Sequence, residues 1–183
     1  MAIKTKRELI YQGRVIKLVK ETFYVNGQRL VREVILHPGA AVIVPLLDDR
    51  RVVMVRQYRR AAGKTLLELP AGTLTPGEPP AQCARRELEE ETGWRAKKWR
   101  RISSFYAAPG MFSEWMIVFL ATGLTKARAH PELDEILTPV ILPLRSALAK
   151  IKSGEICDAK SIIGLLTVRD LLAAGHRRGK NVD

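Results

Sequence analysis

The sequence is poor in the residues that define several common classes of protein. It holds two cysteines, Cys83 and Cys157, and three histidines, and neither set has the spacing of a disulfide framework or a metal motif. Two cysteines without such a pattern are typical of a reducing compartment, so we predict a cytoplasmic protein. Neither cysteine is predicted to act as a nucleophile.

Long apolar runs are also missing. No stretch approaches the roughly 20 residues that a membrane span requires. The opening residues, MAIKTKREL, lack the apolar segment of a secretory signal. We therefore expect no membrane segment. With 183 residues, 46% of them hydrophobic and 27% charged, the chain suits one globular domain with a small appended element.

Acidic residues are the scarcer charged class, with 19 against 31 lysines and arginines and a formal net charge of +12. This balance fits a nucleic-acid binder or an enzyme whose substrate carries phosphates. The basic residues are dispersed along the chain, and no zinc knuckle or RNP motif accompanies them. We therefore favour a solvated basic surface that steers a small anionic substrate, and we do not expect nucleic-acid binding.

Several of the scarce acidic residues are concentrated on one predicted helix. Glu87, Glu90 and Glu91 are spaced i, i+3 and i+4, so they share a sector about 100° wide. Carboxylates at these spacings repel one another. They also precede Gly93, a predicted helix end, where the helix dipole is already negative. A bound divalent cation is the simplest compensation, which points to a metal-dependent enzyme.

The remaining sequence predicts a mixed α/β organisation. Residues 1–39 alternate apolar and polar side chains, and Asn26-Gly27 predicts a hairpin, so we expect a small N-terminal antiparallel β unit there. Residues 40–183 form the second predicted unit. Its expected elements are strands at 40–47 and 51–58 around an Asp48-Asp49 turn, a helix from about 79 to 92, strands within 99–109 and 114–124, and two late helices ending near Gly175.

The acidic helix lies within a longer pattern. Residues 72–94, GTLTPGEPPAQCARRELEEETGW, resemble the Nudix box, G-x5-E-x7-R-E-U-x-E-E-x-G-U with U apolar, at every specified position. The alternative is an acidic helix that is merely solvated. The resemblance implies an α/β/α Nudix fold with a mixed sheet between helices. It also implies hydrolysis of a nucleoside diphosphate linked to another group, with Mg²⁺ or Mn²⁺ as cofactor.

The box also implies residue roles. By position, Glu87, Glu90, Glu91 and the Ala71 carbonyl would be the metal ligands, and Glu91 is counted among the catalytic residues as well. Other members of the box are expected to be structural: Glu78 and Arg86 would pair to join loop and helix, Glu89 would be solvated because it lies about 200° from Glu87, and Trp94 would join the core.

The flanking segments resemble the ADP-ribose pyrophosphatase branch of this family. They read HPGAAVIVPL, VRQYR, LLELPAG, APGMFSE and GEICDAKSIIGLL. The resemblance implies cleavage of ADP-ribose to AMP and ribose 5-phosphate. It also implies a homodimer, because this branch commonly exchanges its N-terminal unit between subunits.

The same branch supplies roles for three further residues. Arg59 would bind a substrate phosphate, although it could instead be a surface arginine. Glu68 would contact metal, water or ribose, with a solvent-facing strand residue as the alternative. Glu114 would line the site.

The resemblance also implies that a glutamate in a late loop, before the final strand, deprotonates or orients the attacking water. The segment HPELDEILTP offers Glu132, Asp134 and Glu135. We favour Glu132, followed by Glu135, as the catalytic base; the alternative is an acidic turn without a catalytic role.

Three other functions remain open at this stage. One is a pyrophosphatase for another nucleoside diphosphate sugar, such as GDP-mannose. Another is a non-catalytic Nudix module that senses a nucleotide. A third is a pyrophosphohydrolase of RNA 5′ ends, which the basic charge would permit.

Overall fold

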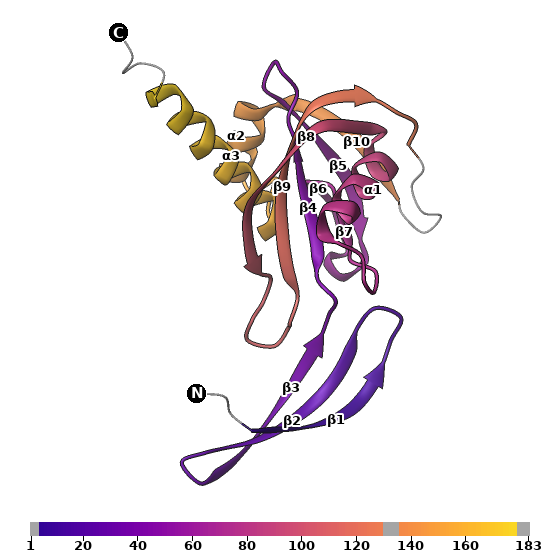
Figure 1. Cartoon of the computed structure of the whole chain (residues 1–183), viewed down its shortest axis with the longest axis vertical. Coiled ribbons are helices and arrows are strands. Elements are labelled where there is room, and N and C mark those ends of the chain that lie inside the picture. Colours follow the sequence, from indigo (N-terminus) through magenta and orange to yellow (C-terminus); the bar gives the residue numbers. More distant parts are fainter. Residues whose placement is uncertain (1–3, 130–135, 179–183) are drawn as a thin grey trace.

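The computed structural model describes residues 4–129 and 136–178. The chain opens with a separate antiparallel sheet of β1 (Thr5–Gln12), β2 (Lys17–Val25) and β3 (Gln28–Leu36). Asn26 and Gly27 both adopt positive φ, 50° and 78°, which is the backbone twist that a two-residue hairpin requires. The predicted hairpin and N-terminal β unit are therefore present. In Figure 1 this sheet projects from the rest of the molecule as a single layer.

The remaining strands form two sheets. One has the order β7-β4-β9-β8 and the other β10-β5-β6. The pair β4 and β9 is parallel, and all other neighbours in these sheets are antiparallel, so the predicted mixed sheet is confirmed. The bounds are β4 (Ala40–Pro45), β5 (Arg51–Arg59), β6 (Lys64–Glu68), β7 (Ala71–Thr73), β8 (Trp94–Tyr106), β9 (Trp115–Lys126) and β10 (Leu137–Pro143), with a short 3-10 helix at Arg60–Ala62.

Helices lie on both faces of the four-stranded sheet that contains β4. Helix α1 (Pro80–Thr92) lies on one side, and α2 (Leu144–Lys152) and α3 (Ala159–Arg178) lie on the other (Figure 1). Strand β4 is fully buried, and its side chains alternate between the two layers. Ile43 packs in a cluster with Leu88 of α1, whereas Val44 packs in a cluster with Leu165 of α3. The predicted α/β/α arrangement is therefore confirmed.

Two elements extend furthest beyond their predicted bounds. Strand β8 begins at Trp94, five residues before the strand predicted from residue 99, and α3 continues past Gly175. The early part of β8 carries exposed lysines and arginines that hide its apolar alternation. Trp99 nevertheless packs toward α1, where the Arg85 guanidinium lies 5.0 Å from its ring centroid. Within the described residues, no helix is long and apolar enough to cross a membrane.

The N-terminal sheet is joined to the body at the end of β3. The Ile35 N–H donates to the Met111 carbonyl at 2.8 Å, and the Ser113 N–H donates to the Ile35 carbonyl at 2.9 Å. The loop between β8 and β9 therefore pairs with the last residues of β3. This contact fixes where the projecting sheet meets the body, and the main cleft of the molecule opens at that junction.

Candidate active site

Helix α1 is positioned by its two ends. Pro80 begins it, where a missing N–H costs nothing, and Gly93 ends it with a left-handed φ of 66°. Ala84 and Leu88 are fully buried against the sheet, so the opposite face is turned toward the loop that follows β7. Glu89 pairs with Arg95 at 2.6 Å, away from that loop, as predicted from its angular position.

Two of the predicted metal ligands converge on one atom. Arg86 Nη1 lies 2.7 Å from Glu87 Oε1 and 2.9 Å from Glu90 Oε2. Arg86 Nε also contacts Glu78 Oε1 at 3.1 Å, so the predicted pairing of Glu78 with Arg86 is confirmed. Burial alone would lower the pKa of Arg86, but its bonds and charge contacts with Glu78, Glu87 and Glu90 raise it well above the ordinary value. The guanidinium therefore stays charged and links loop to helix.

Glu91 lies deeper than its two neighbours. Its side chain is only 1% exposed, and Oε2 accepts a hydrogen bond of 3.1 Å from the Ala71 N–H. A buried carboxylate requires compensation by donors or cations, because desolvation disfavours its charged form. The backbone of β7 at Ala71 provides one donor directly. Glu91 is thereby held against the segment that carries the fourth predicted ligand.

The donor set suits a hard divalent cation in its chemistry. Glu91 contacts the Ala71 backbone and Glu87 lies against Gly72, while Glu90 shares Arg86 with Glu87, and hard divalent cations prefer several such oxygen ligands at one point. Among the residues that the structure describes, however, no group of three or more His, Cys, Asp or Glu side chains is arranged closely enough to hold a metal ion. Glu87 and Glu90 share Arg86, while Glu91 turns to Ala71. The ligand roles therefore remain predictions.

Gly72 allows strand β7 to approach helix α1. A Cβ built on Gly72 would lie 1.8 Å from Glu87 Oε1 and 2.3 Å from Glu87 Cγ, far inside any real contact. We expect Gly72→Ala to displace the Glu87 carboxylate and to lower kcat/KM by about 10²-fold, since a shift of about 1 Å in a catalytic group can cost that much. Steady-state hydrolysis with a nucleotide-sugar substrate would measure it.

Gly110→Ala is the matched control, because a Cβ at Gly110 meets nothing within 4 Å. This variant should keep its activity within about twofold, in the range expected of surface changes. Equal activity of the two alanine variants would contradict the role assigned to Gly72.

The predicted substrate residues Arg59 and Glu68 form an ion pair beside this helix. Arg59 Nη2 lies 2.6 Å from Glu68 Oε2, and Arg59 Nε contacts both carboxylate oxygens at 3.0 and 3.1 Å. Glu68 is 1% exposed, so it is not a solvent-facing strand residue. Burial alone would raise the pKa of Glu68, but Arg59 and Lys160 outweigh it and hold that pKa below its usual value. Glu68 thus orients Arg59 as a charged partner.

Two residues of this network were missed by the sequence reasoning. The Lys160 ammonium contacts Glu68 Oε2 and lies 2.9 Å from Asp158 Oδ2. Asp158 in turn accepts from the Ser161 N–H at 3.1 Å and so caps the start of α3. One signal was available: Lys160 lies in the first turn of a helix, where the dipole disfavours a cation. A lysine at that place needs carboxylate partners.

Glu114 lies near the same charges. Burial raises its pKa, while the positive charges of Lys160 and Arg59 act in the opposite direction. Its Oε1 lies 3.6 Å from Nδ1 of His37, which accepts the Gly39 N–H at 3.0 Å. The pKa of His37 is lowered by burial. The structure thus brings Glu114 to the edge of the Arg59 network, with a neutral imidazole beside it.

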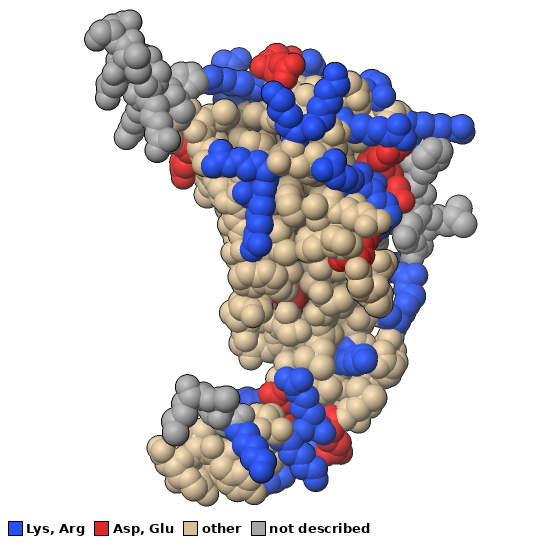
Figure 2. All heavy atoms as spheres, in the orientation of Figure 1, with Lys and Arg blue, Asp and Glu red and all other residues tan. Residues whose placement is uncertain are grey.

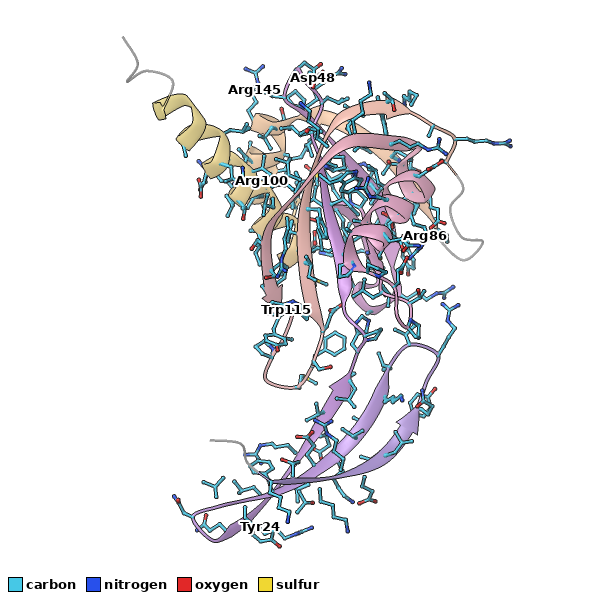
Figure 3. The ribbon with its side chains drawn as sticks, in the orientation of Figure 1. Tyr24, Asp48, Arg86, Arg100, Trp115 and Arg145 are labelled. Atoms are coloured by element: carbon cyan, nitrogen blue, oxygen red, sulfur yellow. The ribbon has the colours of Figure 1, made fainter. Side chains whose placement is uncertain are left out.

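A cleft of about 960 Å³ opens over these groups. Of the predicted site residues, Arg59, Ala71 and Glu87 line it, together with Arg86 and Gly72. The turn between β1 and β2 and the end of β3 supply another part of its lining, so both parts of the chain form one cavity. Figure 3 shows Arg86 on the side of the body that carries α1, above the projecting sheet.

Two further predictions concern individual residues. Glu132 and Glu135, the predicted bases, lie outside the described residues. Burial, followed by the negative charges of Glu87 and Glu78, raises the pKa of the Cys83 thiol to about 12. This high pKa agrees with the prediction that Cys83 is not a nucleophile, because the thiolate is the reactive form.

Comparison with known proteins agrees with this geometry. The NUDIX domain matches residues 36–162. The chain is 39% identical over 173 residues to an ADP-ribose pyrophosphatase of Bacillus subtilis (strain 168), covering 92% of this chain and 94% of that protein. It is also 39% identical over 175 residues to a methanol dehydrogenase activator of Bacillus methanolicus, covering 94% and 95%. The crystal structure of an ADP compounds hydrolase superposes with a TM-score of 0.85 at 26% identity, over 97% of both chains. The chain therefore belongs to the Nudix family.

Proposed function

We propose that this protein hydrolyses ADP-ribose to AMP and ribose 5-phosphate. The observation that carries the proposal is the cleft, which Arg59 and Glu87 of α1 both line. Its volume of about 960 Å³ falls within the range of roughly 300–1,000 Å³ that is common for small-molecule sites. Likeness along nearly the whole chain to an ADP-ribose pyrophosphatase supports this substrate.

The site residues are proposed to have two kinds of role, binding of the diphosphate and binding of the metal ion. Arg59 presents a guanidinium fixed by Glu68 and able to bind a diphosphate oxygen with its remaining N–H groups. Glu87, Glu90, Glu91 and the Ala71 carbonyl would hold Mg²⁺, with Mn²⁺ as the alternative. When bound, the cation neutralises the diphosphate and makes an attacking water easier to deprotonate. The water adds to one phosphorus, and the bond from that phosphorus to the bridging oxygen breaks.

The proton acceptor is assigned from the sequence alone. Glu132, followed by Glu135, is proposed to take the proton from the attacking water. Both lie outside the described residues.

A substrate panel tests the proposed function. Hydrolysis of ADP-ribose, GDP-mannose, ADP-glucose and NADH would be followed with Mg²⁺, and the products separated by ion-exchange chromatography. We expect the highest kcat/KM for ADP-ribose, by at least about tenfold, with AMP and ribose 5-phosphate in equal amounts. A higher kcat/KM for GDP-mannose would change the assigned substrate but leave the assigned reaction, hydrolysis of a diphosphate, unchanged. Absence of hydrolysis of all four compounds, with binding retained, would favour a sensing module.

We also propose that the N-terminal sheet forms a homodimer. All residues of β1 are exposed, and the sheet leaves large apolar side chains in solvent, including Leu9 at 56%, Tyr11 at 59% and Tyr24 at 62%. A single-layer sheet with such a surface needs a partner layer to be stable.

Light scattering after size exclusion would test the dimer, with an expected mass of twice the 20.5 kDa of the chain. Leu9→Glu should shift the mass toward the monomer, because a buried unpaired carboxylate is costly. Ile141→Glu, at an exposed apolar residue on the catalytic body, is the control and should remain dimeric. A monomeric wild-type protein at micromolar concentration would contradict the proposal.

A further inference from the structure

A second cavity lies between the β4–β5 turn and the two late helices. It has a volume of about 640 Å³ and is lined by Arg50, Arg51, Arg145 and Arg169 over apolar side chains of α2 and α3. None of its lining residues belongs to the cleft described above. Figure 3 places Asp48 and Arg145 together at the end of the body farthest from the projecting sheet, and Figure 2 shows basic side chains gathered over that end.

The charges of this cavity are not balanced by its own acids. Four arginines line it against one carboxylate, Asp49. Two of the arginines form ion pairs: Arg51 Nε lies 2.6 Å from Asp49 Oδ2, and Arg169 Nε lies 2.8 Å from Asp170 Oδ1. Arg145 has no ion-pair partner in the part of the chain that the structure describes. Its positive charge faces a concave, partly apolar surface, which is an environment that favours a bound anion.

The backbone at Arg50 has a conformation that an arginine rarely adopts. Leu47 and Arg51 close a three-residue turn, with the Leu47 N–H donating to the Arg51 carbonyl at 2.8 Å, and Arg50 takes a left-handed φ of 60°. Glycine or asparagine is the ordinary choice at this position of such a turn, because a larger side chain is strained there. An arginine in this place is less stable than glycine would be. A residue in such a conformation can persist where its side chain has a functional role, and Arg50 lines the cavity.

A backbone hydrogen bond joins the β4–β5 turn to the start of α2. The Leu144 N–H, at the start of α2, donates to the Arg50 carbonyl at 3.0 Å, which fastens the turn to the helix. Leu144 is buried, and Leu148 and Leu172 are half-buried, so they form an apolar floor beneath the guanidinium groups. Guanidinium groups bind phosphate through paired N–H donors, and an apolar floor accommodates an organic moiety.

We propose that this cavity binds a nucleoside phosphate at a site separate from the catalytic cleft. The phosphate groups contact Arg50 and Arg145, and the nucleoside lies over the leucine side chains. The cavity volume is within the range for a ligand of this size.

Calorimetric titration with ADP, in EDTA and about 0.15 M salt, tests this site. Four proteins would be compared: wild type, the double variant Arg50→Gly/Arg145→Ser, Arg59→Ala in the catalytic cleft, and Arg100→Ser as a control. Arg100 is exposed on β8 and does not line the cavity. We expect ADP binding by the cavity to weaken at least tenfold in the double variant. Binding by the cavity should persist in Arg59→Ala and in Arg100→Ser. The single variant Arg50→Gly should have an unchanged or higher melting temperature, which separates loss of binding from loss of folding.

Three results would overturn the proposal. One is wild-type affinity for ADP in the double variant, and another is loss of all binding in Arg59→Ala alone, which would place every ADP in the catalytic cleft. A third is equal weakening in Arg100→Ser, which would reduce the effect to net charge. Binding of ADP at least tenfold tighter than inorganic pyrophosphate would support the role of the apolar floor. Tighter binding of a glutamate-rich peptide than of ADP would point to a protein partner and contradict the assigned ligand.

Discussion

Replacing Glu91 with glutamine is expected to lower kcat for ADP-ribose by about 10³-fold at saturating Mg²⁺, equivalent to ~4 kcal/mol of transition-state stabilisation. Glutamine keeps the size of the side chain and can still accept the Ala71 N–H bond. It lacks the negative charge that the proposed cation needs. Because Glu91 is only 1% exposed, solvent cannot replace the missing carboxylate. Initial rates over a range of Mg²⁺ concentrations would measure both kcat and the metal requirement.

Glu89→Gln is the matched control on the same helix. Glu89 pairs with Arg95 outside the cleft, so its variant should keep turnover within about twofold. Glu132→Gln or Glu135→Gln should behave differently from Glu91→Gln: loss of the base should lower kcat by roughly 10²-fold with little change in the Mg²⁺ requirement. Near-normal turnover of Glu91→Gln would show that the ligand assignment is wrong.

Replacing Lys160 with methionine is expected to lower the free energy of unfolding by about 3 kcal/mol. Breaking a buried ion pair leaves a charge without its partner and typically costs about 3–5 kcal/mol. The lower end of this range applies here, because Glu68 still forms its ion pair with Arg59 when Lys160 is replaced. Urea denaturation of wild type and variant at pH 7 would measure the difference. The orientation of Arg59 should suffer as well, so kcat/KM should also fall.

Lys150→Met is the control, since Lys150 pairs with Glu155 at the surface and should cost less than about 1 kcal/mol. Adding Glu68→Gln to Lys160→Met should cost less than the sum of the single changes, by about 1 kcal/mol or more. The pKa of Glu68 is lowered in the folded state, so the stabilisation is complete above its unfolded pKa of about 4.3 and disappears as the pH falls through the lower folded value. The gap between wild type and Lys160→Met should therefore narrow in acid. Equal losses in the two lysine variants would contradict a buried network.

The sequence was most informative where one local pattern decides the structure. The bounds of α1 follow from Pro80 and Gly93, and the pairing of Glu78 with Arg86 follows from their places before and within the helix. Helix periodicity also separates Glu89 from Glu87 without any tertiary information. Elements governed by such short-range rules were predicted correctly.

Other features depend on contacts between distant segments. The burial of Glu68 beneath Lys160 requires the docking of α3, which no local pattern specifies. Turn chemistry predicted a turn at Asp48-Asp49, yet the left-handed backbone at Arg50 contradicts the usual residue preference at that place. Exposed basic side chains at the start of β8 obscure its apolar alternation, so the sequence did not predict the first five residues of this strand. In each case tertiary packing outweighs local propensity.

The contact between Lys160 and Glu68 has a consequence for the order in which the site is assembled during synthesis. These residues are 92 positions apart, and α3 follows every other described element along the chain. A nascent polypeptide that has already formed α1 still lacks the Lys160 ammonium that contacts Glu68, so the network around Arg59 is incomplete. Domains emerge from the ribosome from the N-terminus onward. The complete network of Arg59, Glu68 and Lys160 therefore forms only after translation has passed Lys160 and α3 has docked on the sheet.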